Sequence, residues 1–201
     1  MEAWAPIPLS LRPASHPLMI VLGIDPGTRT AGYGVVETSG RGGRTERALD
    51  YGSIDLPADL DHTLRLQRIY DRILGLVDQH HPDEVAVEVP FLGHNVQSMR
   101  KLVRVEATVM LAAMHRQVPV AQYAPAEVKK SVTGKGRATK DQVWFMIRAL
   151  LAVSEDRGLD ASDALAVAVA HARRTQAGPA ASGGAPKDWA AFIKANPGRV
   201  R

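Results

Sequence analysis

The sequence predicts an α/β fold built on a five-stranded mixed sheet that is flanked by helices. Three predicted strands follow one another near the start with only short turns between them, which is typical of antiparallel hairpins. Beyond residue 60, stretches with helical apolar spacing alternate with two further short apolar runs, and this alternation is typical of parallel strands. The 201 residues include no cysteine, which excludes disulfides, thiol nucleophiles and cysteine-ligated metals.

The first predicted strand, residues 18–24, is an apolar run that ends in the turn sequence Asp25-Pro26-Gly27-Thr28. Residues 32–38 and 44–55 follow as the second and third strands, and the glycines at 40, 42 and 43 indicate the turn between them. The later elements are a helix over 63–79, a strand over 84–89, a helix over 96–114 with Val103 among its core residues, a strand over 118–123, a short helix from Pro125, and helices over 139–151 and 161–173.

Composition divides the chain into one domain and two terminal segments. We expect residues 1–17, which contain four prolines, to be a flexible N-terminal extension, and residues 175–201, rich in Ala, Gly and Pro, to be a flexible basic tail. Residues 18–174 form the predicted domain. No apolar run approaches the roughly 20 residues of a membrane span, and the N-terminus lacks the pattern of a signal peptide. We therefore expect a cytoplasmic protein without membrane association.

The charge is unevenly distributed along this domain. The net charge of the whole chain is only +4, but residues 99–148 carry ten Lys or Arg against three Asp or Glu. Residues 18–98 carry seven basic side chains against twelve acidic ones. A basic stretch of this size could be an ordinary solvated face, but its imbalance favours a polyanionic partner such as nucleic acid.

Four carboxylates are predicted to converge at one edge of the sheet. Asp25 directly follows the first strand, Glu88 lies near the end of a strand of valine and alanine, and Asp160 and Asp163 share one side of a helix start. Taken singly, Asp25 could belong to an ordinary turn, Asp160 could cap the helix, and Asp163 could complement its dipole. Glu88 is costly to bury unless it is paired or metal-bound.

Together these four side chains suit a pair of Mg²⁺ ions, whose charge they would balance. Mg²⁺ prefers hard oxygen ligands and keeps waters and phosphates in its coordination shell. Two such ions about 4 Å apart can activate water and stabilise the leaving oxygen of a phosphodiester. The basic stretch would deliver the polyanion to them.

Four short motifs follow one another along the chain: Gly23-Ile24-Asp25-Pro26-Gly27-Thr28, Ala86-Val87-Glu88, Tyr123-Ala124-Pro125 and Asp160-Ala161-Ser162-Asp163. In this order they resemble the RuvC family of Holliday-junction resolvases, and the resemblance covers roughly residues 18–174. It implies a ribonuclease-H-like fold, a homodimer with the helix around residues 103–107 at its interface, and paired symmetric nicking of four-way DNA junctions in recombination and repair. It further implies two Mg²⁺ or Mn²⁺ ions per active site and a branch-migration motor as a partner.

The resemblance also implies roles for individual residues. Asp25, Glu88, Asp160 and Asp163 match the family's catalytic, metal-binding carboxylates. Phe91 matches an aromatic residue that stacks on a base near the junction centre. Two lysines match basic residues near the scissile phosphate, and with the rest of the basic stretch they form the predicted DNA-binding set: Arg100, Lys101, Arg104, Lys129, Lys130, Lys135, Arg137 and Lys140, of which Lys129 and Lys140 are the two matching lysines.

Two other functions stay open on the sequence alone. One is a junction-binding module on the same fold without catalysis, against which the intact set of four carboxylates speaks. The other is an actin-like nucleotide-binding lobe, because the motif at residues 23–28 also resembles the first phosphate loop of that superfamily. That fold usually needs a longer chain, and Gly134-Lys135-Gly136 lacks the spacing of a Walker-type loop. We interpret His94 and His171 as polar groups at the surface or behind the metal ligands.

Overall fold

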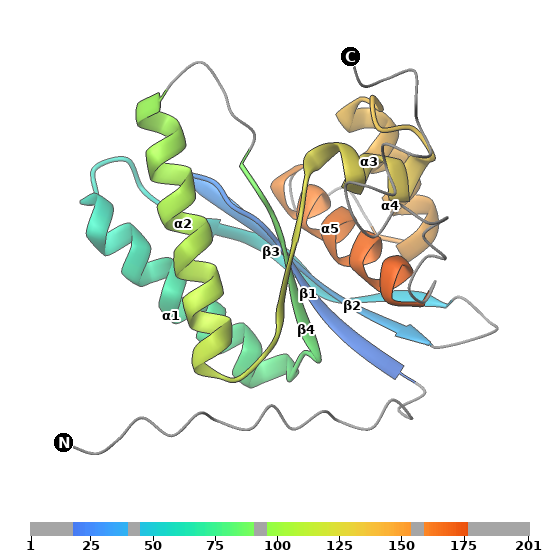
Figure 1. Ribbon diagram of the computed structural model, residues 1–201, viewed down its shortest axis with the longest axis horizontal. Helices are drawn as coiled ribbons and strands as arrows, with labels where there is room; N and C mark the ends of the chain where they lie inside the picture. The colour runs from blue at the N-terminus through green and yellow to red at the C-terminus, as the bar shows by residue number, and fades with distance from the viewer. Residues whose placement is uncertain (1–17, 40–44, 91–95, 154–158, 177–201) are drawn as a thin grey trace, which may run out of the picture.

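The computed structural model describes residues 18–39, 45–90, 96–153 and 159–176 as a five-stranded sheet between two layers of helices (Figure 1). The strand order is β3-β2-β1-β4-β5. The first three strands are antiparallel, and the last two run parallel to β1. Their bounds are β1 Leu18–Asp25, β2 Thr30–Ser39, β3 Glu46–Asp55, β4 Glu84–Glu88 and β5 Val120–Tyr123. The predicted mixed sheet with an antiparallel start is therefore confirmed.

Helices cover both faces of this sheet (Figure 1). Two of them, α1 (His62–His80) and α2 (Val96–His115), lie on one face. The other face carries α3 (Pro125–Thr133), α4 (Lys140–Leu151) and α5 (Leu159–Gln176). Every predicted strand and helix is present, with bounds within three residues of those expected. The predicted flexible tail begins two residues too early, because α5 continues to Gln176. The predictions for residues 1–17, for the turn glycines at 40, 42 and 43, for Phe91 and His94, and for the tail from residue 177 onward lie outside the described residues.

Alternation along β1 sends side chains into two separate cores. Leu22 and Ile24 are buried with residues of α1 and α2, whereas Val21 is buried with residues of α3, α4 and α5. None of the described helices has the length and apolarity needed to cross a membrane. One core prediction is wrong: Val103 is 47 % exposed, because α2 buries Val105 and Val109 and turns Val103 outward.

Candidate active site

Two carboxylates end adjacent parallel strands. Asp25 is the last residue of β1, and Glu88 is the last residue of β4. Because Ile24 pairs with Val87 in the parallel register, the next residue along each strand brings Asp25 beside Glu88. Neighbouring strands lie about 4.8 Å apart, so these two side chains share one edge of the sheet. The prediction that they lie together at this edge is confirmed.

Helix α5 brings the other two carboxylates to the same edge. Asp160 and Asp163 lie in its first turns, and all four carboxylates are half-buried. The helix approaches the sheet closely because glycines face it. A Cβ atom added at Gly32 of β2 would lie 2.0 Å from the Asp160 carbonyl oxygen, and one at Gly23 of β1 would lie 2.2 Å from that of Ala164. This role of the two glycines was not predicted from the sequence, where their place inside apolar strands was the available signal.

The electrostatics of Asp25 and Glu88 reflect this crowding. Burial raises the pKa of Asp25 to about 7, and the charges of Glu88, Asp163 and Asp160 push it in the same direction. Burial likewise raises the pKa of Glu88 to about 7, with Asp163 adding to the effect. Like charges this close together, partly withdrawn from water, favour protonation unless a cation compensates them. The structure therefore brings together all four predicted carboxylates.

Two predicted lysines border this cluster. The Lys140 Nζ atom donates a hydrogen bond to the Asp163 Oδ2 atom over 2.7 Å. Its charge lowers the pKa of both Asp25 and Glu88, and Lys129 acts in the same sense on Glu88. The contact with Asp163 in turn raises the pKa of Lys140. Cations thus oppose, without cancelling, the mutual repulsion of the carboxylates.

The donor set of this cluster fits a divalent metal. Carboxylate oxygens suit Mg²⁺ and Mn²⁺, and burial together with neighbouring carboxylates raises the pKa values of Asp25 and Glu88, so a cation beside them would favour their charged forms. As the side chains stand, no group of three or more Asp, Glu, His or Cys within the described ranges is closed tightly enough to surround an ion.

The predicted DNA-binding residues lie on segments that border this edge. Helix α2 follows the carboxyl end of β4, and Arg100, Lys101 and Arg104 are exposed in its first half. His62, at the start of α1, lies near two of these residues. Burial lowers its pKa, and the neighbouring charges of Arg104 and Lys101 lower it further. The remaining predicted residues lie on α3, in the segment that follows it and at the start of α4; Lys129 is half-buried, and Lys130, Lys135, Arg137 and Lys140 are exposed.

The structure excludes one of the two places predicted for His171, the protein surface. His171 is only 2 % exposed, on α5. Its Nδ1 atom is 2.7 Å from the Tyr123 hydroxyl oxygen, and its Nε2 atom is 2.9 Å from the Glu84 Oε2 atom. The imidazole therefore joins α5 to the start of β4 and the end of β5. Helical periodicity places it on the buried side of α5, but the polar partners come from strands far away in the sequence.

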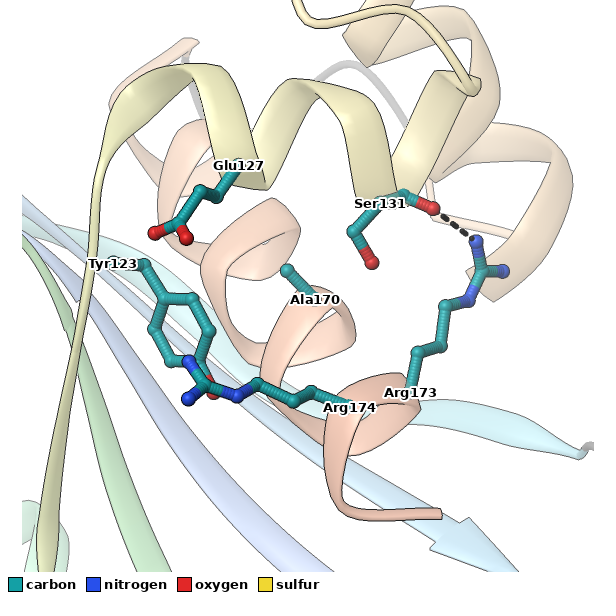
Figure 2. Close-up of a pocket in the computed structure, with 6 residues that line it drawn as sticks. All are labelled: Tyr123, Glu127, Ser131, Ala170, Arg173 and Arg174. Atoms are coloured by element: carbon teal, nitrogen blue, oxygen red, sulfur yellow. Dashed lines mark hydrogen bonds between the residues drawn. The ribbon is translucent and has the colours of Figure 1, made fainter. Parts of the chain in front are cut away.

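A hollow of about 290 Å³ lies between α3 and α5 (Figure 2). Its α5 residues belong to the last part of that helix, whereas Asp160 and Asp163 lie at its start. The Arg173 side chain, which lines the hollow, donates two hydrogen bonds to the Glu46 carboxylate, of 2.9 and 3.1 Å, and a third to the Ser131 carbonyl oxygen. Arg174 lies over the Tyr123 ring, 5.4 Å from its centre. These contacts tie α3, α5 and β3 together. We assign the hollow no part in the candidate active site.

The strand order and the helices on both faces define a ribonuclease-H-like fold, and comparisons with known proteins identify the family within it. A family model described as crossover junction endodeoxyribonuclease RuvC matches residues 21–171. The chain belongs to the RuvC family.

Relatives of the same name resemble the chain over most of its length. The RuvC protein of Salinibacter ruber is 48 % identical over 183 residues, covering 90 % of this chain and 99 % of the relative. That of Porphyromonas gingivalis is 44 % identical and covers 90 % and 97 %. The solved structure of Thermus thermophilus RuvC in complex with Holliday junction substrate is 34 % identical, with a TM-score of 0.74, and covers 80 % of this chain and 96 % of that one.

Proposed function

We propose that the chain is a crossover junction endodeoxyribonuclease that resolves four-way DNA junctions by paired symmetric nicks during recombination and repair. The observation that carries this proposal is the meeting of four carboxylates and two lysines at one sheet edge. Relatives named as such enzymes, and a T. thermophilus relative solved with a Holliday junction substrate, support it. They give no support to the nucleotide-binding alternative.

The four carboxylates would hold two divalent ions, Mg²⁺ or Mn²⁺. When bound, such ions supply an activated water and stabilise the leaving oxygen of the phosphodiester. Asp25 lies between Glu88 and α5, so it would contact both ions. Glu88 and Asp163 would hold one ion each, and Asp160 would assist. The products would carry a 5′-phosphate and a 3′-hydroxyl.

Lys129 and Lys140 would bind and orient the scissile phosphate. Both are close enough to Glu88 for their charges to lower its pKa. A fixed ammonium at this point offsets negative charge that develops on the phosphate during displacement. The exposed basic residues of α2, α3 and the segment before α4 would hold the junction arms through their phosphates.

A homodimer is part of this proposal, because two paired nicks need two active sites related by symmetry. Helix α2 carries four exposed apolar side chains at spacings that keep them on one side: Val96, Val103, Leu111 and Met114, exposed by 70, 47, 62 and 62 %. A second copy of the chain would cover this side. Membership of the RuvC family, with bacterial relatives of the same name, also supports a branch-migration motor as a partner and a cytoplasmic location.

The test is cleavage of a synthetic mobile junction with Mg²⁺, with Mn²⁺ and with chelator. We expect the wild-type chain to nick two strands of like polarity symmetrically when either metal is present. Asp25→Asn should keep junction binding and lose nicking, because it removes the carboxylate shared by both ions. Full nicking by this variant would contradict the assignment, and binding without nicking by the wild type would favour a non-catalytic junction-binding module.

A further inference from the structure

Lys140 occupies a defined place beside the carboxylate cluster. It is the first residue of α4, whose start is fixed by Thr139: the Thr139 side chain accepts a hydrogen bond from the Gln142 amide, and the Gln142 side chain accepts one from the Thr139 amide. From there the lysine reaches across to α5, where its Nζ atom lies 2.7 Å from Asp163 Oδ2. The start of α4 is therefore anchored while the lysine side chain spans the gap.

The two partners of this ion pair differ in their freedom to move. The Asp163 side chain is 19 % exposed and belongs to a helix whose neighbouring residues are buried in the core, whereas the Lys140 side chain is 67 % exposed. Lysine has a long flexible stem and three donors that can turn to new acceptors. Breaking the contact consequently requires movement of one exposed side chain and leaves α4 and α5 in place.

The same carboxylate cannot serve the lysine and a metal ion equally well. An ammonium hydrogen bonded to Oδ2 occupies a lone pair that a metal would use, and a divalent ion beside it would be repelled over a few ångströms. At the same time Lys140 is among the cations that oppose the repulsion between Asp25, Glu88 and Asp163. In the metal-free protein Lys140 thus supplies part of the positive charge that a metal ion would supply.

We propose that Lys140 competes with the divalent metal for Asp163, and that metal binding releases it toward the substrate phosphate. The inference rests on the proposed function, because it takes the carboxylate cluster as the metal site. In the metal-free protein the lysine holds Asp163 and compensates its charge. Once released, the ammonium is free to contact a phosphate at the same edge, so binding of metal and of DNA would reinforce each other.

Calorimetric titration of the DNA-free protein with Mn²⁺ at pH 8 tests this competition without measuring activity. Lys140→Met removes the charge and keeps an unbranched side chain, so we expect it to tighten Mn²⁺ binding by roughly three- to fivefold, the upper part of the range expected of a partly exposed ion pair. Lys140→Arg keeps the charge and should stay within about twofold of the wild type on the same scale. Lys130→Met removes an exposed charge of α3 that has no described contact with the cluster, and should change the affinity by less than about twofold. Thermal melting of each metal-free variant checks that it is folded.

Unchanged or weaker Mn²⁺ binding by folded Lys140→Met would overturn the inference, since the lysine would then be neutral toward the metal or would help to position Asp163 for it. Tightening of the same size in Lys130→Met would also overturn it, by assigning the effect to general charge. Junction cleavage by the wild type in the same buffer separates the inference from the function on which it rests. Cleavage together with unchanged affinity in Lys140→Met rejects the competition and leaves the proposed function standing, whereas no cleavage by the wild type rejects the proposed function.

Discussion

Replacing Asp25 by asparagine should stabilise the metal-free protein although it should abolish nicking. The pKa of Asp25 is about 7 in the folded chain against 3.8 for an unperturbed aspartate, so the folded protein retains a proton that the unfolded chain loses. Below pH 3.8 both states are protonated at this site and the carboxyl group carries no penalty. As the pH rises from 3.8 to about 7, the unfolded state alone ionises and stability falls. Above about 7 the penalty is complete.

The size of this penalty follows from the shift of the pKa. Each pKa unit corresponds to about 1.4 kcal/mol, so the shift to about 7 sets a ceiling of about 4 kcal/mol at pH 8. Part of it comes from repulsion by Glu88 and Asp163, which the uncharged amide would also relieve for those two neighbours, so the contributions are shared and not additive. We expect Asp25→Asn to gain about 2–4 kcal/mol at pH 8 and less than about 0.5 kcal/mol at pH 4.

Urea unfolding in chelator, at one fixed protein concentration and at both pH values, measures this difference. Asp59→Asn is the matched control, because Asp59 is an exposed carboxylate outside the cluster and should change stability by less than about 0.5 kcal/mol. Saturating Mg²⁺ should then stabilise the wild type and leave Asp25→Asn nearly unchanged. Equal or lower stability of Asp25→Asn at pH 8, or a gain of the same size at pH 4, would refute the argument that burial and neighbouring carboxylates penalise the ionised Asp25.

Three further predictions concern the close approach of α5 to the sheet, the buried His171 and the proposed dimer interface. Gly32→Ala should lower the free energy of unfolding by about 1–3 kcal/mol and weaken Mn²⁺ binding, because the added Cβ meets the start of α5. Gly75→Ala in α1 is the control: with open space around it, it should stabilise the protein by up to about 1 kcal/mol. Equal effects of the two substitutions on stability would contradict the close packing of α5 against Gly32. Tyr123→Phe should lower the free energy of unfolding by about 1–3 kcal/mol in urea titrations, because it removes the hydroxyl partner of buried His171, and a neutral result would show that this contact stabilises nothing. Leu111→Asp should convert the dimer to a monomer in light scattering coupled to size-exclusion chromatography, and a persistent dimer would exclude the α2 surface as the interface.

The sequence was sufficient to predict the elements and part of the site. Apolar periodicity placed each strand and helix within three residues, and the parallel order of the later strands brought Asp25 to Glu88. The contact between Lys140 and Asp163 depends on how α4 packs against α5, which periodicity within either helix does not determine. The exposure of Val103 escaped prediction for a related reason: an apolar residue near the edge of a helical stripe can face the core or a second chain, and its spacing is the same in both cases.

The placement of the acidic cluster between basic segments has a consequence for the order of binding. Without metal, the edge presents four carboxylates against Lys129 and Lys140, so a phosphate would meet net negative charge there even though the basic residues of α2 and α3 would attract the rest of the DNA. Two divalent ions would carry as much positive charge as the four carboxylates carry negative, and the two lysines would then act unopposed. The arms of a junction can therefore be held by the basic segments before the scissile phosphate is drawn to the edge. Metal binding would control that second step, because the ions proposed to perform the chemistry would also reverse the local sign of the charge.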